Sequence, residues 1–148
     1  IMPLLFPILG IKKMLLTGMF AWVLRYLLFA LGAHDQVVWI ILAGVILHGI
    51  CYDFFFVAGF IYVDKKSTKD IRAQAQGFVV LATYGFGMLI GAQLAGYLFN
   101  GMVDASSPEV FKQWQNFWYV PAVLAAIVMV FFAAMFKDKE IEKLEGAN

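Results

Sequence analysis

Four long apolar runs constrain the fold of this chain more than any other feature of its sequence. They extend from about Met14 to Ala33, from Val37 to Val63, from about Ile71 to Phe99 and from Phe117 to Phe136. Runs of about 20 to 29 residues form helices roughly 30 to 44 Å long, which is enough to cross the hydrocarbon of a bilayer. The sequence therefore predicts an all-α, polytopic transmembrane helix bundle, in which the two longest helices tilt, bend or project beyond the bilayer.

Composition and charge exclude several other classes of protein. Hydrophobic residues make up 63% of the chain, and the charged residues, only 14%, fall between the apolar runs, so a soluble domain is excluded. One cysteine, Cys51, lies inside the second run, which leaves no disulfide framework and no set of metal ligands. A net charge of +1 without a basic stripe predicts no nucleic-acid partner. Because no nucleophile with its base and no phosphate-binding loop is visible, we expect neither an enzyme nor a bound cofactor.

The first ten residues are apolar but too short to span a membrane. They contain Pro3 and Pro7 and lack both the basic start and the cleavage site of a signal peptide. We interpret residues 1–10 as the truncated end of a preceding transmembrane helix, followed by the four-helix region over 11–136. On this interpretation the chain is a C-terminal fragment, and its partners are the lipid bilayer and the missing amino-terminal helices of the same protein.

Basic residues predict the orientation in the membrane. If the four runs alternate in direction, nine of the eleven Lys and Arg residues fall on one side: Lys12, Lys13, Lys65, Lys66, Lys69, Arg72, Lys137, Lys139 and Lys143. The positive-inside rule makes that side cytoplasmic. It places 137–148 as a cytoplasmic tail, the loops Gly32 to Gln36 and Asn100 to Asn116 outside, and Trp114, Trp118 and Tyr119 at the outer interface.

The second run carries most of the candidate chemistry. A carboxylate such as Asp53 is costly in hydrocarbon, so it marks a substrate or proton site unless it pairs permanently with a cation or a helix terminus. At ~3.6 residues per turn, Tyr52 shares a face with His48 and with Phe56. Aromatic side chains stack on a flat ring, and a carboxylate accepts hydrogen bonds from hydroxyls. The cluster therefore predicts a site for substrate binding or proton coupling, although His48 fits a purely structural hydrogen bond equally well.

Arg25 is the second charge that the sequence places deep in the membrane. It lies near the middle of the first run, too far from either end for its side chain to reach water easily. It needs an anionic or carbonyl partner, and Asp53 is the only other intramembrane charge. Counting ~1.5 Å per residue from the outer loop places Asp53 about 10 Å deeper, so the partner of Arg25 could instead lie in the missing part.

Small residues dominate the third run. Gly87 and Gly91 form a G-x-x-x-G pair, a spacing that lets helix backbones approach closely. Two interpretations remain open, tight packing or a helix that moves during gating. Replacing Gly91 with Leu separates them: loss of folded protein indicates packing, whereas normal insertion with slowed transport indicates gating.

Several short motifs in a fixed order resemble one family. They are G-I-K-K at 10–13, A-W-V-L-R at 21–25, Y-D-F-F at 52–55, R-A-Q-A-Q-G at 72–77 and G-F-G at 85–87. Together they resemble the C-terminal part of bacterial nucleoside/proton symporters of the major facilitator superfamily, over essentially the whole chain. The resemblance implies that the four runs are helices nine to twelve of a twelve-helix transporter.

The resemblance also implies a function. It implies proton-coupled uptake of a nucleoside across the bacterial cytoplasmic (inner) membrane by alternating access, and it places Asp53 and Tyr52 in the nucleoside site. Two positions depart from the family pattern, since an aromatic residue is usual at His48 and an asparagine at Tyr84, so ligand preference can differ. A free-standing four-helix membrane protein that acts as a small oligomeric transporter or assembly subunit is the alternative. An intramembrane enzyme would need a catalytic partner beside Asp53, and the sequence shows none.

Overall fold

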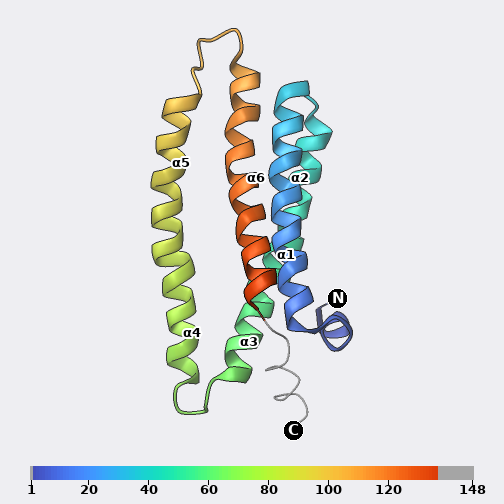
Figure 1. Ribbon diagram of the computed structural model, residues 1–148, viewed down its shortest axis with the longest axis vertical. Helices are drawn as coiled ribbons and strands as arrows, with labels where there is room; N and C mark the ends of the chain where they lie inside the picture. Colours follow the sequence, from blue (N-terminus) through green and yellow to red (C-terminus); the bar gives the residue numbers. More distant parts are fainter. Residues whose placement is uncertain (1, 137–148) are drawn as a thin grey trace.

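The computed structural model describes residues 2–136, with side chains described from Gly10 onward. The elements follow one another as α1 (Met2–Asp35), α2 (Val38–Tyr52), η1 (Asp53–Val57), α3 (Ala58–Lys66), α4 (Arg72–Val80), η2 (Leu81–Gly87), α5 (Met88–Met102) and α6 (Val110–Met135). The elements η1 and η2 are π-helical segments that continue the helices on either side of them. Every described element is helical, and Figure 1 shows that these elements join into long rods. The tail predicted at 137–148 lies outside the described residues.

Four of these rods are long and apolar enough to cross a membrane. In chain order, the first to the fourth rod comprise Gly10–Asp35, Val38–Lys66, Arg72–Met102 and Val110–Met135. This arrangement confirms the predicted fold class, an all-α polytopic helix bundle.

The two expected outer loops are shorter than predicted. The expected loop Gly32 to Gln36 is mostly helical, because α1 continues to Asp35, and α6 begins at Val110 inside the expected loop Asn100 to Asn116. The prediction was wrong because it ended each helix where the apolar residues end. Helical hydrogen bonds are local, and they continue through polar residues beyond the hydrocarbon.

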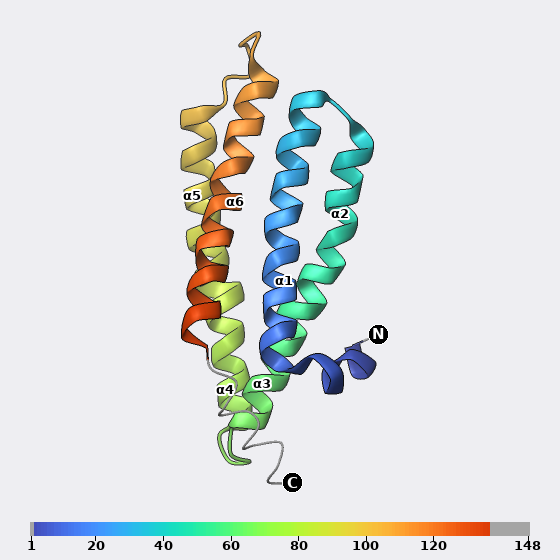
Figure 2. The same ribbon diagram turned by 45° about the vertical axis from the view of Figure 1, so that its right-hand side comes forward.

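The central helix of the bundle is α1, which packs against α2 and α6 (Figures 1 and 2). Its residues Ile11, Met14 and Leu15 are buried together with Ala58 of α3. Aromatic side chains of the same cluster come from η1, α3, α6 and the residue after α6: Phe54, Phe55, Tyr62, Phe132 and Phe136. In contrast, α5 has no buried residue among those described, so its apolar side chains are available to lipid or to other helices.

A sharp bend divides α1 at Gly10. The backbone there has φ 68° and ψ 164°, which interrupts the helical geometry. Glycine adopts a positive φ without the steric penalty of a Cβ atom. Figure 2 shows the segment before the bend turned away from the axis of the bundle. That this segment is the end of a preceding membrane helix remains a prediction.

Three glycines let α1 and the second rod approach closely. A Cβ atom built on Gly18 would lie 2.8 Å from the backbone nitrogen of Phe55, and one on Gly32 would lie 2.7 Å from the side chain of Ile41. One on Gly44 would lie 2.7 Å from the ring of Phe29. The close contact between α1 and the second rod is therefore made at these three glycines.

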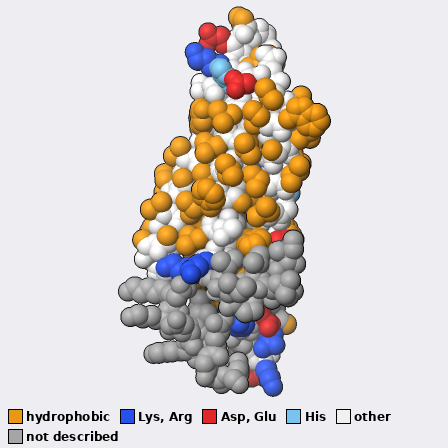
Figure 3. All heavy atoms as spheres, turned by 90° about the vertical axis from the view of Figure 1, so that its right-hand side faces the viewer, with side chains coloured by type: hydrophobic (Ala, Val, Ile, Leu, Met, Phe, Trp, Pro, Cys, Tyr) orange, Lys and Arg blue, Asp and Glu red, His pale blue; other side chains and the backbone are white. Residues whose placement is uncertain are grey.

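Charge is segregated along the length of the bundle. A broad band of hydrophobic side chains covers the middle of the face in Figure 3, and charged side chains gather toward its two ends. The described basic residues outside the apolar band lie at the end of α3, in the turn after it and at the start of α4, near the start of the first span and, at Lys112, near the start of α6. The apolar band matches the solvent that a bilayer provides.

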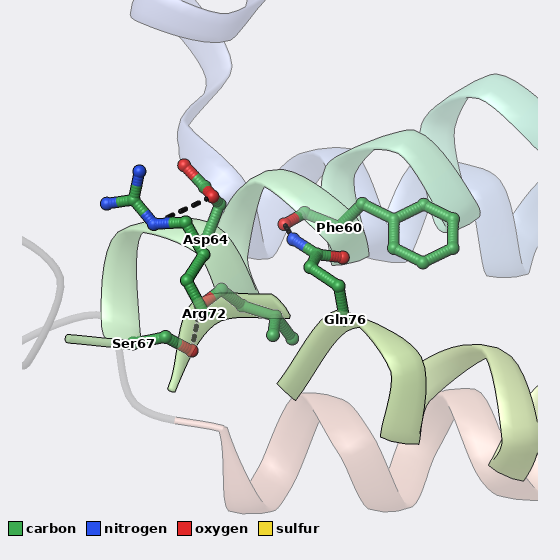
Figure 4. A network of polar contacts seen from close by, with 6 residues as sticks. Phe60, Asp64, Ser67, Arg72 and Gln76 are labelled. Carbon is green, nitrogen blue, oxygen red and sulfur yellow. Dashed lines mark hydrogen bonds and ion pairs between the residues drawn. The ribbon is translucent and has the colours of Figure 1, made fainter. Parts of the chain in front are cut away.

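Polar contacts close the turn between α3 and α4 (Figure 4). Arg72 Nε lies 3.1 Å from Asp64 Oδ1, and Gln76 Nε2 donates a 2.9 Å hydrogen bond to the carbonyl oxygen of Phe60. Ser67 Oγ donates to the carbonyl oxygen of Val63 at 2.7 Å. The ion pair is about half exposed, because the side chains of Arg72 and Asp64 are 46% and 45% accessible.

A double-mutant cycle on Asp64→Asn and Arg72→Gln is expected to give a coupling energy of no more than about 1 kcal/mol. Exposed ion pairs contribute little, because water and salt screen the two charges. Thermal unfolding of the four proteins in detergent, at low and at high salt, measures the coupling. A value well above this range that does not fall with salt would show that the pair is buried in the complete protein.

Candidate functional site

A cavity of about 520 Å³ lies between three rods of the bundle. Its lining combines aromatic, polar and small residues from α1, α2, η1, η2 and α5: Trp22, Arg25, Tyr26, His48, Tyr52, Phe56, Thr83, Tyr84, Gly87 and Met88. Its size falls in the range of pockets that hold small molecules, ~300–1,000 Å³. The other large hollows are lined mostly by apolar side chains, so this cavity is the candidate functional site.

The two π-helical segments meet at this cavity. Tyr84 of η2 donates a 3.0 Å hydrogen bond to the hydroxyl oxygen of Tyr52, which directly precedes η1. The ring of Phe56 in η1 lies 5.2 Å from that of Tyr52 and 5.5 Å from that of Tyr84. Single π-helical turns within α-helices are frequent at functional sites. The sequence analysis expected regular helices here, and residue pattern alone did not indicate the change.

Arg25 and His48, which both line the cavity, contact each other. The guanidinium nitrogen Nη1 lies 2.8 Å from Nδ1 of the imidazole. The guanidinium carbon also lies 5.7 Å from the ring centre of Tyr26 and 5.3 Å from that of Phe29, which adds cation–π attraction. Among the described residues, Arg25 thus contacts an imidazole nitrogen, whereas the sequence predicted an anion or a carbonyl as its partner.

Depth in the membrane explains this pairing. Arg25 lies ten residues before the end of α1 at Asp35, and His48 lies ten residues after the start of α2 at Val38. Both are therefore about 15 Å from the same end of the bundle. Counting residues from the outer end of each helix therefore indicates His48, and not the deeper Asp53, as the residue level with Arg25.

Asp53 does not line the cavity. Its side chain is exposed at the surface of the described bundle, and it begins η1 directly after Tyr52. Within residues 10–136 no ion pair joins Asp53 to Arg25 or to another cation. Of the four residues predicted for substrate binding or proton coupling, the structure brings together His48, Tyr52 and Phe56.

The two glycines predicted for packing or gating lie in different surroundings. Gly87 lines the cavity, and a Cβ atom there would lie 3.1 Å from the carbonyl oxygen of Ala82 in its own rod. Around Gly91 no described atom lies within 4 Å of such a Cβ atom. Gly91 instead borders an apolar hollow of about 550 Å³ between α1, α5 and α6. Their role in packing or gating remains a prediction.

Several cavity residues escaped the sequence analysis. Trp22 and Tyr26 come from α1, one turn apart on the face that carries Arg25, and Thr83 and Met88 flank Tyr84 on the third rod. A signal for Trp22 exists in the sequence, since residues three or four positions from an intramembrane arginine share its helix face, and Tyr26 lies four positions from Trp22. No comparable signal points to Thr83 or Met88.

A multispan helical bundle with a polar and aromatic cavity between its membrane-length helices is the architecture of a membrane transport protein. The chain belongs to the nucleoside H+ symporter family, which matches residues 1–141. This is a family of transporters.

Named relatives support the assignment. The chain is 36% identical over 137 residues to YegT of Escherichia coli strain K12, a match that covers 90% of this chain and 32% of YegT. It is 32% identical over 145 residues to the nucleoside permease NupG of the same strain, covering 94% of this chain and 32% of NupG. The xanthosine permease of that strain is 35% identical over 138 residues, with coverages of 92% and 32%. The chain therefore spans about a third of the length of these relatives.

The fold agrees with a solved relative. The crystal structure of nucleoside transporter NupG superposes with a TM-score of 0.78 at 28% identity, covering 92% of this chain and 33% of that one. The four rods thus have the arrangement found in part of a major-facilitator-type transporter.

Proposed function

We propose that this chain forms part of a secondary transporter that moves nucleosides together with protons across the bacterial inner membrane by alternating access. The nine basic residues that the sequence predicts on one side support a cytoplasmic C-terminus. The observation that carries the proposal is the cavity, whose three packed rings offer faces for a nucleobase and whose hydroxyls and nitrogens offer hydrogen bonds. Family membership supports the choice of nucleoside and proton.

Each predicted residue has a distinct part in this proposal. Tyr52 and Phe56 pack against the base, and the imidazole of His48 makes the cavity they share more polar. Asp53, beside Tyr52 in sequence, binds the sugar hydroxyls or carries the proton. The alternative of a free-standing four-helix protein is not favoured, because the relatives NupG and the xanthosine permease are transporters in which this region is one third of the chain.

Uptake tests the proposal directly. Cells that lack their own nucleoside carriers express the protein at its full natural length and are supplied with radiolabelled uridine or inosine at two external pH values. We expect uptake that rises at acidic pH and collapses when a protonophore removes the proton gradient. Cells that accumulate no nucleoside under any of these conditions would remove the nucleoside assignment.

Replacing Phe56 with Ala is expected to raise the KM for nucleoside about tenfold while the amount of folded protein changes little. The ring contacts both Tyr52 and Tyr84, and an aromatic stacking contact is worth about 0.5–1.5 kcal/mol beyond its buried area. Phe131→Ala is the matched control, because the ring of Phe131 in α6 is 64% exposed and lies outside the cavity. Equal KM values for both variants would contradict a ligand contact at Phe56.

A further inference from the structure

The contact between Arg25 and His48 determines which imidazole nitrogen carries the proton. A guanidinium group has five N–H donors and no acceptor. Its 2.8 Å contact with Nδ1 is a hydrogen bond only if Nδ1 has no proton and accepts. A neutral imidazole that accepts at Nδ1 carries its proton at Nε2. Arg25 therefore holds His48 as the Nε2–H tautomer.

The Nε2–H group is then a donor without a partner in the bundle. Within the described residues His48 makes only the contact with Arg25. His48 lines the cavity and is exposed in the described bundle, so a molecule bound there can supply the acceptor. A ligand that presents an acceptor forms a hydrogen bond with this donor, whereas one that presents a second donor displaces water from His48 and leaves both donors unpaired.

Another side chain that lines the cavity also has a hydrogen-bond donor without an acceptor among the described residues. Tyr84 donates its hydroxyl proton to Tyr52, which leaves the hydroxyl proton of Tyr52 free to donate elsewhere. Thr83 donates to the carbonyl oxygen of Val79 at 2.7 Å. The Nε atom of Arg25 is buried and has no hydrogen-bond partner among the described residues. Two donors, on His48 and Tyr52, thus belong to side chains that line the cavity, and the Nε donor of Arg25 lies buried.

We propose that Arg25 fixes His48 as an N–H donor toward the ligand, and that this donor makes the transporter prefer a carbonyl over an amino group at C4 of a pyrimidine base or C6 of a purine base. The proposal rests on the nucleoside function proposed above and specifies its substrate class. A carbonyl oxygen accepts from His48 Nε2, whereas an amino group places a second donor against it. Uridine is then preferred to cytidine, and inosine to adenosine. Arg25 is a positioning residue, since it acts through His48.

Nitrogen spectroscopy tests the tautomer itself. In the full-length protein labelled with ¹⁵N-histidine, the resonances of His48 are identified by their loss in His48→Gln. We expect a protonated Nε2 and an unprotonated Nδ1 in the wild type, and a mixture of tautomers in Arg25→Leu. A wild-type protein with its proton on Nδ1, or a tautomer unchanged by Arg25→Leu, would overturn the proposal. This readout needs no transport and does not move if Arg25 merely supports packing.

Uptake ratios test the selectivity. For each pair we expect the wild type to favour the carbonyl nucleoside about tenfold in kcat/KM, the factor that one hydrogen bond of ordinary strength produces. His48→Phe should bring both ratios close to one, because the ring keeps its volume and loses the donor. His48→Gln, which restores an N–H group, should recover most of the preference. Arg25→Lys keeps a donor for Nδ1 and should lie between wild type and Arg25→Leu.

The second histidine provides the control. His34 lies at the end of α1, 2.7 Å from Asp35, and does not line the cavity. His34→Gln should leave both ratios at wild-type values. If nucleosides are taken up but the ratios ignore substitutions at His48, the selectivity proposal fails while the transport function stands. If no nucleoside of either pair enters the cells, the transport function itself fails.

Discussion

Cells that express the Asp53→Asn protein are expected to lose proton-driven accumulation of nucleoside while the amount of folded transporter stays at the wild-type level. Asparagine has the shape of aspartate but cannot carry and release a proton. One unit of pH difference across the membrane is worth about 1.4 kcal/mol per coupled proton, which supports about a tenfold accumulation of ligand. Without coupling, the ratio of internal to external nucleoside should fall to about one.

The free energy of unfolding of the Asp53→Asn protein should be equal to or higher than that of the wild type. An ionised aspartate at the centre of a membrane helix costs about 2.5–3.5 kcal/mol for insertion, and no cation in the described bundle offsets this cost at Asp53. Removing the charge therefore relieves an unfavourable term. If Asp53→Asn cells lose nucleoside accumulation but keep the wild-type amount of folded transporter, Asp53 acts in transport and not in folding.

Exchange across the membrane distinguishes the two parts proposed for Asp53. If the carboxylate only couples the proton, Asp53→Asn vesicles should still exchange labelled for unlabelled nucleoside. If it binds the sugar, exchange is lost too. Asp35→Asn is the control, because Asp35 pairs with His34 at the end of α1, far from the cavity. Wild-type accumulation with unchanged pH dependence in Asp53→Asn would remove Asp53 from the mechanism.

Replacing Gly18 with Ala is expected to destabilise the folded protein by about 1–3 kcal/mol, and replacing it with Leu to abolish folding in most molecules. The new Cβ atom would lie 2.8 Å from the backbone nitrogen of Phe55 and 3.0 Å from the carbonyl carbon of Phe54. Backbone atoms cannot rotate away as the end of a side chain can. The clash would push the second rod away from α1 and disturb η1, which carries Phe56.

Gly49 provides a matched control for Gly18. It lies in α2, in the rod that Gly18 contacts, and no described atom comes within 4 Å of a Cβ atom placed there. Gly49→Ala should unfold at or above the wild-type temperature, since alanine favours a helix over glycine. Size-exclusion profiles and thermal unfolding in detergent measure both variants at full length. Equal stability of Gly18→Ala and Gly49→Ala would show that α1 and the second rod do not approach as closely as described.

Much of the fold was predictable because lipid imposes simple requirements. A backbone in hydrocarbon must satisfy its own hydrogen bonds, so four apolar runs had to become four helices. The ends of the helices were less predictable, and α6 begins seven residues before the apolar run at Phe117. Hydropathy reports where hydrocarbon begins, whereas a helix ends where its backbone hydrogen bonds end.

The site was predictable in part. Periodicity along one helix grouped His48, Tyr52 and Phe56, and the cavity contains all three. Periodicity could not show that Tyr84 meets Tyr52 or that His48 meets Arg25, because these contacts join separate helices. The close approaches at Gly18, Gly32 and Gly44 were not predicted either, because spacing along one helix does not show which other helix it meets.

The number of membrane helices, the segregation of charge between their ends and the family of the chain could be predicted from the amino-acid order alone, since each depends on residues that are near one another in the chain. Which helix faces meet, where the rods change to π-helical geometry and which donor each acceptor finds could be known only from the folded bundle. Helices in lipid have no hydrophobic force that selects one apolar face over another, so the faces are chosen by shape and by a few polar contacts. Those contacts, above all Arg25 with His48 and Tyr84 with Tyr52, also form the walls of the cavity.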